Sequence, residues 1–118
     1  KIHITVLLRG GPAANDATME DAEEVGLTKE AECTGNGSCL MGTDFSDLSP
    51  EAIALLKKAD MIIAKGQGNF ETMHGCGLNI WFLFLCKCEY FTRKFHLPQF
   101  SSVLMKEKRD ATEKGVEL

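Results

Sequence analysis

Two short segments of the sequence carry residue types suited to binding a cation and a phosphate group. The segment "GGPAANDAT" contains Asn15 and Asp16, whose amide and carboxylate oxygens are hard donors that suit magnesium or manganese. The segment "KGQGN" contains Lys65 followed by Gly66 and Gly68. A lysine beside glycines, whose backbone N–H groups can approach a ligand closely, is an arrangement that binds anions. Together the two segments indicate phosphoryl chemistry.

Both segments also have structural interpretations, which the pattern alone leaves open. Asn15 and Asp16 are residue types that cap helices, and capping is the interpretation that the pattern favours. Lys65 could simply extend its apolar stem from a strand end. The lysine precedes the glycines and no G-K-[ST] follows, so "KGQGN" is not a Walker A loop.

Composition predicts one globular domain that binds neither nucleic acid nor a membrane. Of the 118 residues, 44% are hydrophobic and 25% are charged, which is ordinary for such domains. The net charge is −4, and the sequence contains no basic stripe of the kind that binds nucleic acid. The longest apolar run, residues 80–86, is too short to cross a bilayer. The chain opens on the strand-like "KIHITVLL" rather than on a signal peptide, so we expect a cytoplasmic location.

The five cysteines allow two interpretations. An odd number without a secretory context predicts reduced thiols rather than disulfides. A zinc site is the alternative, because His74, Cys76, Cys86 and Cys88 lie close together in sequence. The one-residue spacing of Cys86 and Cys88 is unusual for zinc, and buried packing is the favoured role.

Strands alternate with helices along the chain, which predicts an α/β fold with a largely parallel sheet. The expected strands are residues 2–8, 61–64, 79–86 and 101–106, and the expected helices are 15–26, 50–58 and 88–95, with a loop over 33–47 that holds at most a short strand. The strand over 79–86 is almost wholly apolar, as expected for a strand covered on both faces. Ligands bind beyond the carboxyl ends of parallel strands, so both segments are expected on the same rim of one sheet.

Three motifs occur in this order along the chain: "NDATMEDA", "ADMIIAKGQGNFE" and "NIWFLFLCKCEYFTRKF". Together they resemble the metal-dependent damage-control phosphatases, the ARMT1-like domain family. The resemblance implies a three-layer α/β/α sandwich and the hydrolysis of phosphate monoesters, such as sugar phosphates or damaged phosphometabolites. It also implies a divalent metal: manganese, cobalt, nickel or magnesium.

The resemblance assigns roles to named residues. Asp16, with Asn15, would bind the metal, and Lys65 would contact the substrate phosphate. Asn69 would line that phosphate pocket, and Gly66 and Gly68 would shape the turn. Asp21 would support the first loop. Asp44 and Glu71 are candidates for the general base only because of their positions in loops.

The sequence departs from the family at one motif. Family members carry an upstream motif like D-N-x-G-E that supplies two further metal ligands, and this chain has none. Residues 1–106 are therefore expected to be the C-terminal half of the domain, an incomplete unit, and 107–118 a charged tail. Alone, this half is predicted to bind metal weakly, to show little or no phosphatase activity, and to expose apolar surface.

Two other functions remain open from the sequence. One is a non-catalytic α/β module that binds a phosphorylated metabolite through "KGQGN" without turnover. The other is a small structural domain held by zinc. In each phosphate-binding case the partner is a small-molecule phosphate ester, and the sequence indicates no oligomeric state.

Overall fold

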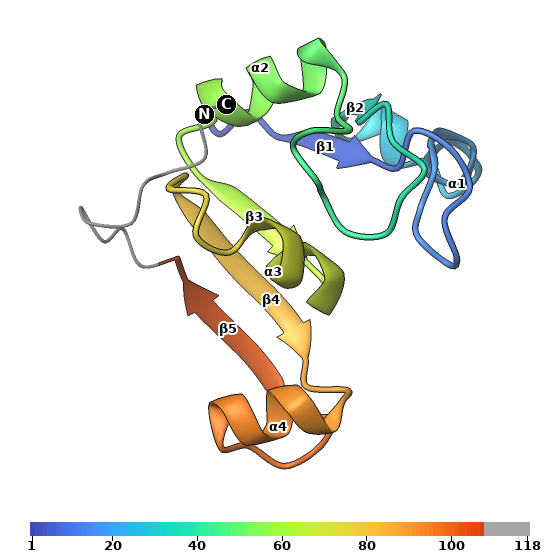
Figure 1. Cartoon of the computed structure of the whole chain (residues 1–118). Helices are drawn as coiled ribbons and strands as arrows, with labels where there is room; N and C mark the ends of the chain where they lie inside the picture. Colours follow the sequence, from blue (N-terminus) through green and yellow to red (C-terminus); the bar gives the residue numbers. More distant parts are fainter. Residues whose placement is uncertain (108–118) are drawn as a thin grey trace.

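The computed structural model describes residues 1–107, which form short strands and helices in alternation (Figure 1). In chain order the elements are β1 (Thr5–Leu8), α1 (Met19–Glu24), the 3-10 helix η1 (Leu27–Lys29), β2 (Glu32–Gly35), α2 (Pro50–Lys58), β3 (Ile62–Lys65), α3 (Gln67–Met73), β4 (Ile80–Leu85), α4 (Glu89–Phe95) and β5 (Ser102–Lys106). The α/β class is confirmed, and the predicted elements lie close to their expected places. No helix within residues 1–107 has the length and apolar character needed to cross a membrane.

Two helices begin directly after residues that cap them, and α1 is shorter than the predicted helix over 15–26. Thr18 and Asp21 form a reciprocal capping box at α1, in which the Asp21 carboxylate accepts from the Thr18 backbone N–H at 2.8 Å. At α2 the Ser49 hydroxyl accepts a hydrogen bond from the backbone N–H of Ala52 at 3.1 Å, and Pro50 fills the first helical position. Both caps satisfy N–H groups that a helix start leaves without partners.

The strands form two sheets, where a single largely parallel sheet was predicted. β1 pairs with β2 in parallel, and β3 pairs in parallel with β4. β5 joins the edge of β4 in the antiparallel direction, since the chain reverses through α4 at the end of that strand. Figure 1 shows β1 and β2 beside α2, at an angle to the three-stranded sheet.

Residues 1–107 bury one face of the three-stranded sheet. Its apolar side chains pack with residues of α2, α3 and α4 in a single core. Phe70 of α3 is at the centre of that core, with its ring 5.1 Å from those of Phe82 and Phe84 and 5.5 Å from that of Phe91. The described residues thus hold two of the three predicted layers.

The prediction that β4 is covered on both faces is wrong for residues 1–107. Burial alternates along the strand: Ile80, Phe82 and Phe84 are buried, whereas Leu83 and Leu85 are 43% and 41% exposed. The apolar run reflects two apolar faces, of which the described residues cover one.

The predicted tail, residues 107–118, lies outside the described residues except for Glu107. That residue is buried, and its carboxylate lies 3.2 Å from His74 Nδ1. Burial raises the pKa of the Cys76 thiol, and the negative charge of Glu107 adds to the shift. Glu107 therefore belongs to the folded part of the chain rather than to an exposed tail.

Candidate functional site

The turn after β1 brings the candidate ligand Asp16 onto a buried arginine. The Asp16 carboxylate lies 3.0 Å from a terminal nitrogen of Arg9. The Arg9 side chain is only 7% exposed, whereas that of Asp16 is 42% exposed. The capping interpretation of Asp16 is wrong, because α1 begins at Met19 and its cap is Thr18. Asn15 beside it is exposed.

Arg9 also contacts the loop that follows β2. It donates a hydrogen bond to the carbonyl of Gly42, and its buried Nε has no hydrogen-bond partner among the described residues. Because the guanidinium is enclosed and binds on two sides, it fixes the turn that carries Asp16 against the loop at Gly42.

The turn after β3 takes its shape from Gly66 and Asn69. Gly66 has a φ of 99°, a conformation that side chains other than glycine rarely adopt. The Asn69 amide donates to the Lys65 carbonyl at 2.7 Å, and its oxygen accepts from the Thr43 hydroxyl at 2.7 Å. Asn69 therefore supports the turn from within, and its predicted contact with phosphate stays a prediction.

Gly68 has a different role from the one predicted. It lies inside α3 and does not make the sharp turn, which Gly66 makes alone. A Cβ atom at Gly42 would come within 2.7 Å of the Gly68 carbonyl oxygen, so the loop and the helix touch backbone to backbone. The backbone N–H of Thr43 donates to the Thr72 hydroxyl at 2.7 Å beside this contact.

These contacts connect the two candidate turns through one loop. Arg9 holds both Asp16 and Gly42, and Gly42 with Thr43 packs on the start of α3. The two turns belong to different sheets, so the prediction that they share the rim of one sheet is wrong. The loop after β2, rather than a common sheet, connects the turn at Asp16 with the turn at Lys65.

Lys65 and Asp16 do not touch within residues 1–107. Lys65 is exposed, and its side chain forms no hydrogen bond or ion pair with described residues. Its place opposite Leu83 in the β3–β4 register puts it on the exposed face of the sheet, away from the face that α3 covers. An exposed, unpaired ammonium at a strand end is free to meet an anion.

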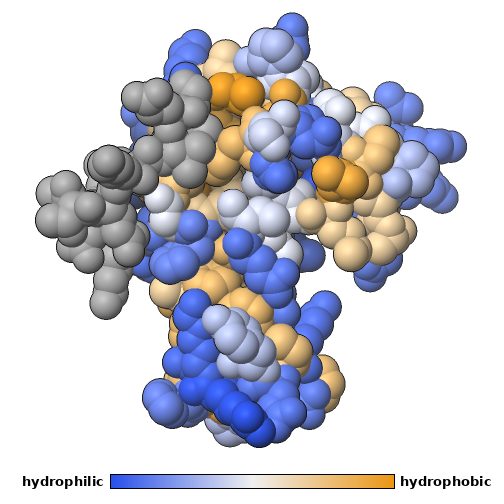
Figure 2. Space-filling view, viewed as in Figure 1, coloured by the Kyte–Doolittle hydropathy of each residue, from blue (hydrophilic) through white to orange (hydrophobic). Residues whose placement is uncertain are grey.

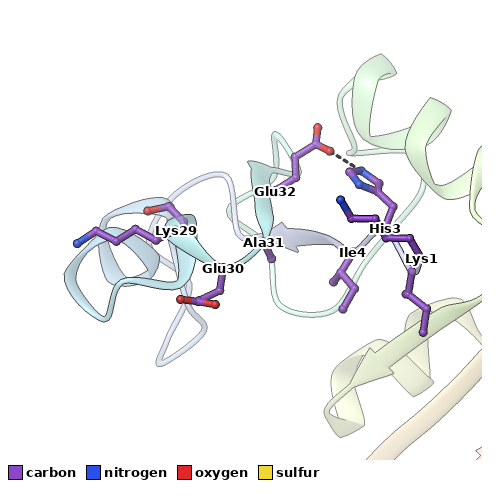
Figure 3. A pocket seen from close by; sticks show the side chains of 9 residues that line it. Lys1, His3, Ile4, Lys29, Glu30, Ala31 and Glu32 are labelled. Atoms are coloured by element: carbon purple, nitrogen blue, oxygen red, sulfur yellow. Dashed lines mark hydrogen bonds and ion pairs between the residues drawn. The ribbon is translucent and has the colours of Figure 1, made fainter.

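Two shallow hollows on the surface lie away from these residues. One, of about 480 Å³, is lined by Glu89, Tyr90, Arg93 and Lys94. The other, of about 430 Å³, lies between residues 1–4 and 28–32. Figure 3 shows His3 pointing to Glu32 at its edge, with Lys29 and Glu30 turned away. Neither hollow contains a predicted site residue.

The remaining acids have local roles. Hydrogen bonds from the backbone and hydroxyl of Thr18 hold the pKa of Asp21 below its usual range, as expected of a residue that supports the first loop. Hydrogen bonds from Ser46 likewise lower the pKa of Asp44, which makes that carboxylate a weaker base. Glu71 accepts a hydrogen bond from the Gln67 side chain on its own helix.

The described residues do not form a metal site by themselves. Within residues 1–107, no three His, Cys, Asp or Glu side chains lie close enough to hold an ion. All five cysteines are free thiols, and Cys76 and Cys86 are buried in the core. This removes the zinc interpretation for the described part of the chain. It also means that Asp16 would need ligands from elsewhere to bind a divalent ion.

Sequence reasoning missed Arg9, Gly42 and Thr43. Arg9 directly follows the four residues of a strand, and Asp16 lies seven residues further along the chain. A cation at a strand end with an acid nearby in sequence was the signal that could have indicated the pair. Gly42 and Thr43 lie in a polar loop whose path depends on contacts distant in sequence, so no local pattern marks them.

The fold and the turns define an α/β protein with a lysine–glycine turn at a strand end and a carboxylate turn linked to it. A family model, described as the damage-control phosphatase ARMT1-like domain, matches residues 1–103. The chain belongs to this family, and the predicted resemblance is confirmed.

Curated relatives and a solved structure agree with this assignment. Damage-control phosphatase PH1575 of Pyrococcus horikoshii is 39% identical over 99 residues, which cover 83% of this chain and 34% of that protein. A damage-control phosphatase of Archaeoglobus fulgidus is 38% identical over 92 residues, covering 76% of this chain and 32% of that protein. The crystal structure of a DUF89 family protein, PH1575 from P. horikoshii, superposes with a TM-score of 0.80 at 37% identity, covering 90% of this chain and 38% of that one.

The chain thus spans about a third of the length of the curated relatives it matches. The prediction that it corresponds to only part of a family domain is confirmed, and the share is smaller than the half expected.

Proposed function

We propose that a protein of full family length containing this chain is a metal-dependent phosphatase. It would hydrolyse phosphate monoesters, either of sugar phosphates or of damaged phosphometabolites. Membership of a family whose curated relatives are named damage-control phosphatases is the observation that carries this proposal.

In this proposal the chain supplies the phosphate contact. Lys65 has an ammonium group that is unpaired among the described residues, and Gly66 makes the sharp backbone turn beside it. Gly68 and Asn69 hold the turn against the loop at Gly42 and Thr43, which keeps the strand end in one shape. A cation at this strand end would favour the negative charge of a phosphate group over neutral molecules.

The chain would supply only part of the metal site. Asp16, with Asn15 beside it, would contribute oxygen ligands to manganese, cobalt, nickel or magnesium, and the other ligands would come from outside residues 1–107. When bound, such an ion would stabilise the charge on the phosphate oxygens. Asp16 is already paired with Arg9, so residues 1–107 alone do not fit a divalent ion.

That same pair favours a second function, a module that binds a phosphorylated metabolite without turnover. Arg9 neutralises the one carboxylate of the site, whereas Lys65 remains available for an anion. In this case phosphate would bind through "KGQGN" and no added metal would change the result.

The test uses a chimera in which this chain replaces the matched segment of the P. horikoshii protein. We expect manganese-dependent hydrolysis of p-nitrophenyl phosphate, and a fall in kcat/KM of about 10²-fold for Lys65→Ala. Lys29→Ala, another exposed lysine, is the matched control and should leave the rate unchanged. Binding of inorganic phosphate without hydrolysis would select the second function. Hydrolysis at equal rates by Lys65→Ala and Lys29→Ala would contradict the first function, and equal phosphate affinity of the two variants would contradict the second.

A further inference from the structure

The helix α3 starts without a side-chain cap, unlike α1 and α2. Its N-cap position is Gly66, whereas Thr18 and Ser49 cap the other two helices with their hydroxyl groups. A helix start without such a cap depends on other partners for its backbone. The shape of the turn at Lys65 and Gly66 therefore depends on other contacts.

The peptide group between Lys65 and Gly66 is held at both of its polar ends. The Gly66 N–H donates to the Leu83 carbonyl at 2.9 Å, at the end of the β3–β4 pairing. The Lys65 carbonyl accepts from the Asn69 side-chain amide at 2.7 Å. Since a peptide group is planar, these two bonds fix its plane, and with it the backbone angle that directs Lys65 at the end of the strand.

Thr43 determines how the Asn69 amide is oriented. A carbonyl can only accept, so the nitrogen of that amide faces Lys65, and its oxygen is left to accept from the Thr43 hydroxyl at 2.7 Å. Thr43 is only 7% exposed, so water has little access to take the place of this hydroxyl. The hydroxyl therefore holds Asn69 in the orientation that fixes the Lys65 carbonyl.

Thr43 is itself anchored on two sides. Its backbone N–H donates to the Thr72 hydroxyl at 2.7 Å, and that hydroxyl donates to the Gly68 carbonyl at 2.8 Å. The residue before it, Gly42, accepts a hydrogen bond from the buried Arg9. The Thr43 hydroxyl thus lies at a fixed place relative to the start of α3.

We propose that Thr43 is a positioning residue for phosphate binding: through Asn69, its hydroxyl fixes the strand end from which Lys65 meets a phosphate group. The inference rests on the proposed function, in which Lys65 contacts phosphate, and it holds for both functions considered above. Without the hydroxyl, Asn69 keeps one partner, and the peptide group after Lys65 can turn. Phosphate would then have to order the strand end as it binds, which weakens its affinity.

Phosphate binding by the chimera tests the proposal, with inorganic phosphate as the probe and calorimetry as the measurement. We expect Thr43→Val to raise the Kd about tenfold, the size of one lost hydrogen bond. Thr43→Ala should do the same without placing a second methyl group against Asn69, and Thr43→Ser should restore the original Kd. In manganese-dependent hydrolysis of p-nitrophenyl phosphate, KM should rise by a similar factor and kcat should change by less than about twofold, because the contact is made in the bound substrate and in the transition state alike.

A second background separates positioning from a general loss of structure. In the Lys65→Ala chimera, Thr43→Val should raise the Kd by less than about twofold, because a residue that acts through Lys65 has no effect once that side chain is gone. The matched control is Thr92→Val, whose hydroxyl donates to the Glu89 carbonyl at 2.8 Å within α4. That helix lies in the mainly hydrophilic lobe at the bottom of Figure 2, well apart from the loop after β2 in Figure 1, so this variant should leave the Kd unchanged.

The outcomes separate this inference from the proposed function. An unsubstituted chimera that binds no phosphate overturns both. If that chimera binds phosphate, equal Kd values for Thr43→Val, Thr43→Ala and Thr92→Val overturn the inference alone. The same follows if Thr43→Ser fails to restore the Kd, or if Thr43→Val weakens binding as much in the Lys65→Ala chimera as in the unsubstituted one.

Discussion

The two partners of the Arg9–Asp16 ion pair differ in burial, and this difference predicts which of them can be replaced with the smaller loss of stability. The Arg9 side chain is 7% exposed and that of Asp16 is 42% exposed. Replacing Asp16 by alanine leaves a buried cation whose other contact is the Gly42 carbonyl. Replacing Arg9 by methionine leaves an exposed carboxylate that water can hydrate.

The structure sets the size of each effect. Removing one partner of a fully buried pair costs about 3–5 kcal/mol. Asp16 is partly hydrated, which weakens the pair, so we expect Asp16→Ala to cost about 2 kcal/mol. Arg9→Met keeps most of the buried volume and leaves the Gly42 carbonyl without this donor, a loss of about 1 kcal/mol. The double variant should be more stable than Asp16→Ala alone, since it contains no buried cation.

Urea unfolding of the 118-residue chain, followed by the fluorescence of Trp81, measures all three free energies. Asp60→Ala is the matched control, because Asp60 is an exposed aspartate whose backbone carbonyl, not its carboxylate, accepts a hydrogen bond. The reasoning is refuted if Asp16→Ala costs no more than Asp60→Ala. The same holds if Arg9→Met lowers the free energy of unfolding more than Asp16→Ala does and the double variant is no more stable than Asp16→Ala.

Three further predictions concern the fold. Ser49→Ala removes the cap of α2 and should lower the free energy of unfolding by about 1 kcal/mol, seen as a lower Tm in a thermal melt. Phe82→Ala should lower the free energy of unfolding in urea by about 3–5 kcal/mol, whereas Leu83→Ala, next in sequence but on the exposed face of the sheet, should change it by about 0.5 kcal/mol or less. Because the folded pKa of Asp21 is lowered, its stabilisation is present above the ordinary aspartate pKa and is lost as the pH falls through the folded value. Unfolding of Asp21→Asn measured across acid pH should therefore show a shallower loss than the unsubstituted chain.

Local signals were sufficient to predict most of the elements, although the 3-10 helix η1 was not predicted. Thr18 with Asp21, and Ser49 with Pro50, mark helix starts that depend only on hydrogen bonds within a few residues. The strand before Lys65 is a short apolar run between polar residues, which is equally local. Such features are readable without knowledge of the rest of the fold.

The arrangement of the elements was not readable in the same way. The split into two sheets depends on which strands pair across long stretches of chain, and no local pattern records that choice. The burial of Arg9 likewise depends on a loop more than thirty residues away in sequence, at Gly42. Polar partners that meet only in the folded chain leave no periodic signal.

The exposure of one face of β4 differs from the prediction for another reason. The apolar residues of β4 predict burial on both sides, and residues 1–107 bury one. An apolar pattern carries no information about which part of a longer protein covers each face of a strand, and this chain spans about a third of the length of its curated relatives.

A double-variant cycle in the full-length chimera tests most directly whether Asp16 and Lys65 act in one phosphate-hydrolysing site. The kcat/KM of manganese-dependent hydrolysis of p-nitrophenyl phosphate is measured for the unsubstituted chimera, Asp16→Asn, Lys65→Ala and the double variant. Residues that act as a unit are not additive, so the double variant should lose little more activity than the more harmful single change. Full-rate hydrolysis by either single variant, or losses that simply multiply in the double variant, would show that the two residues do not act in one site.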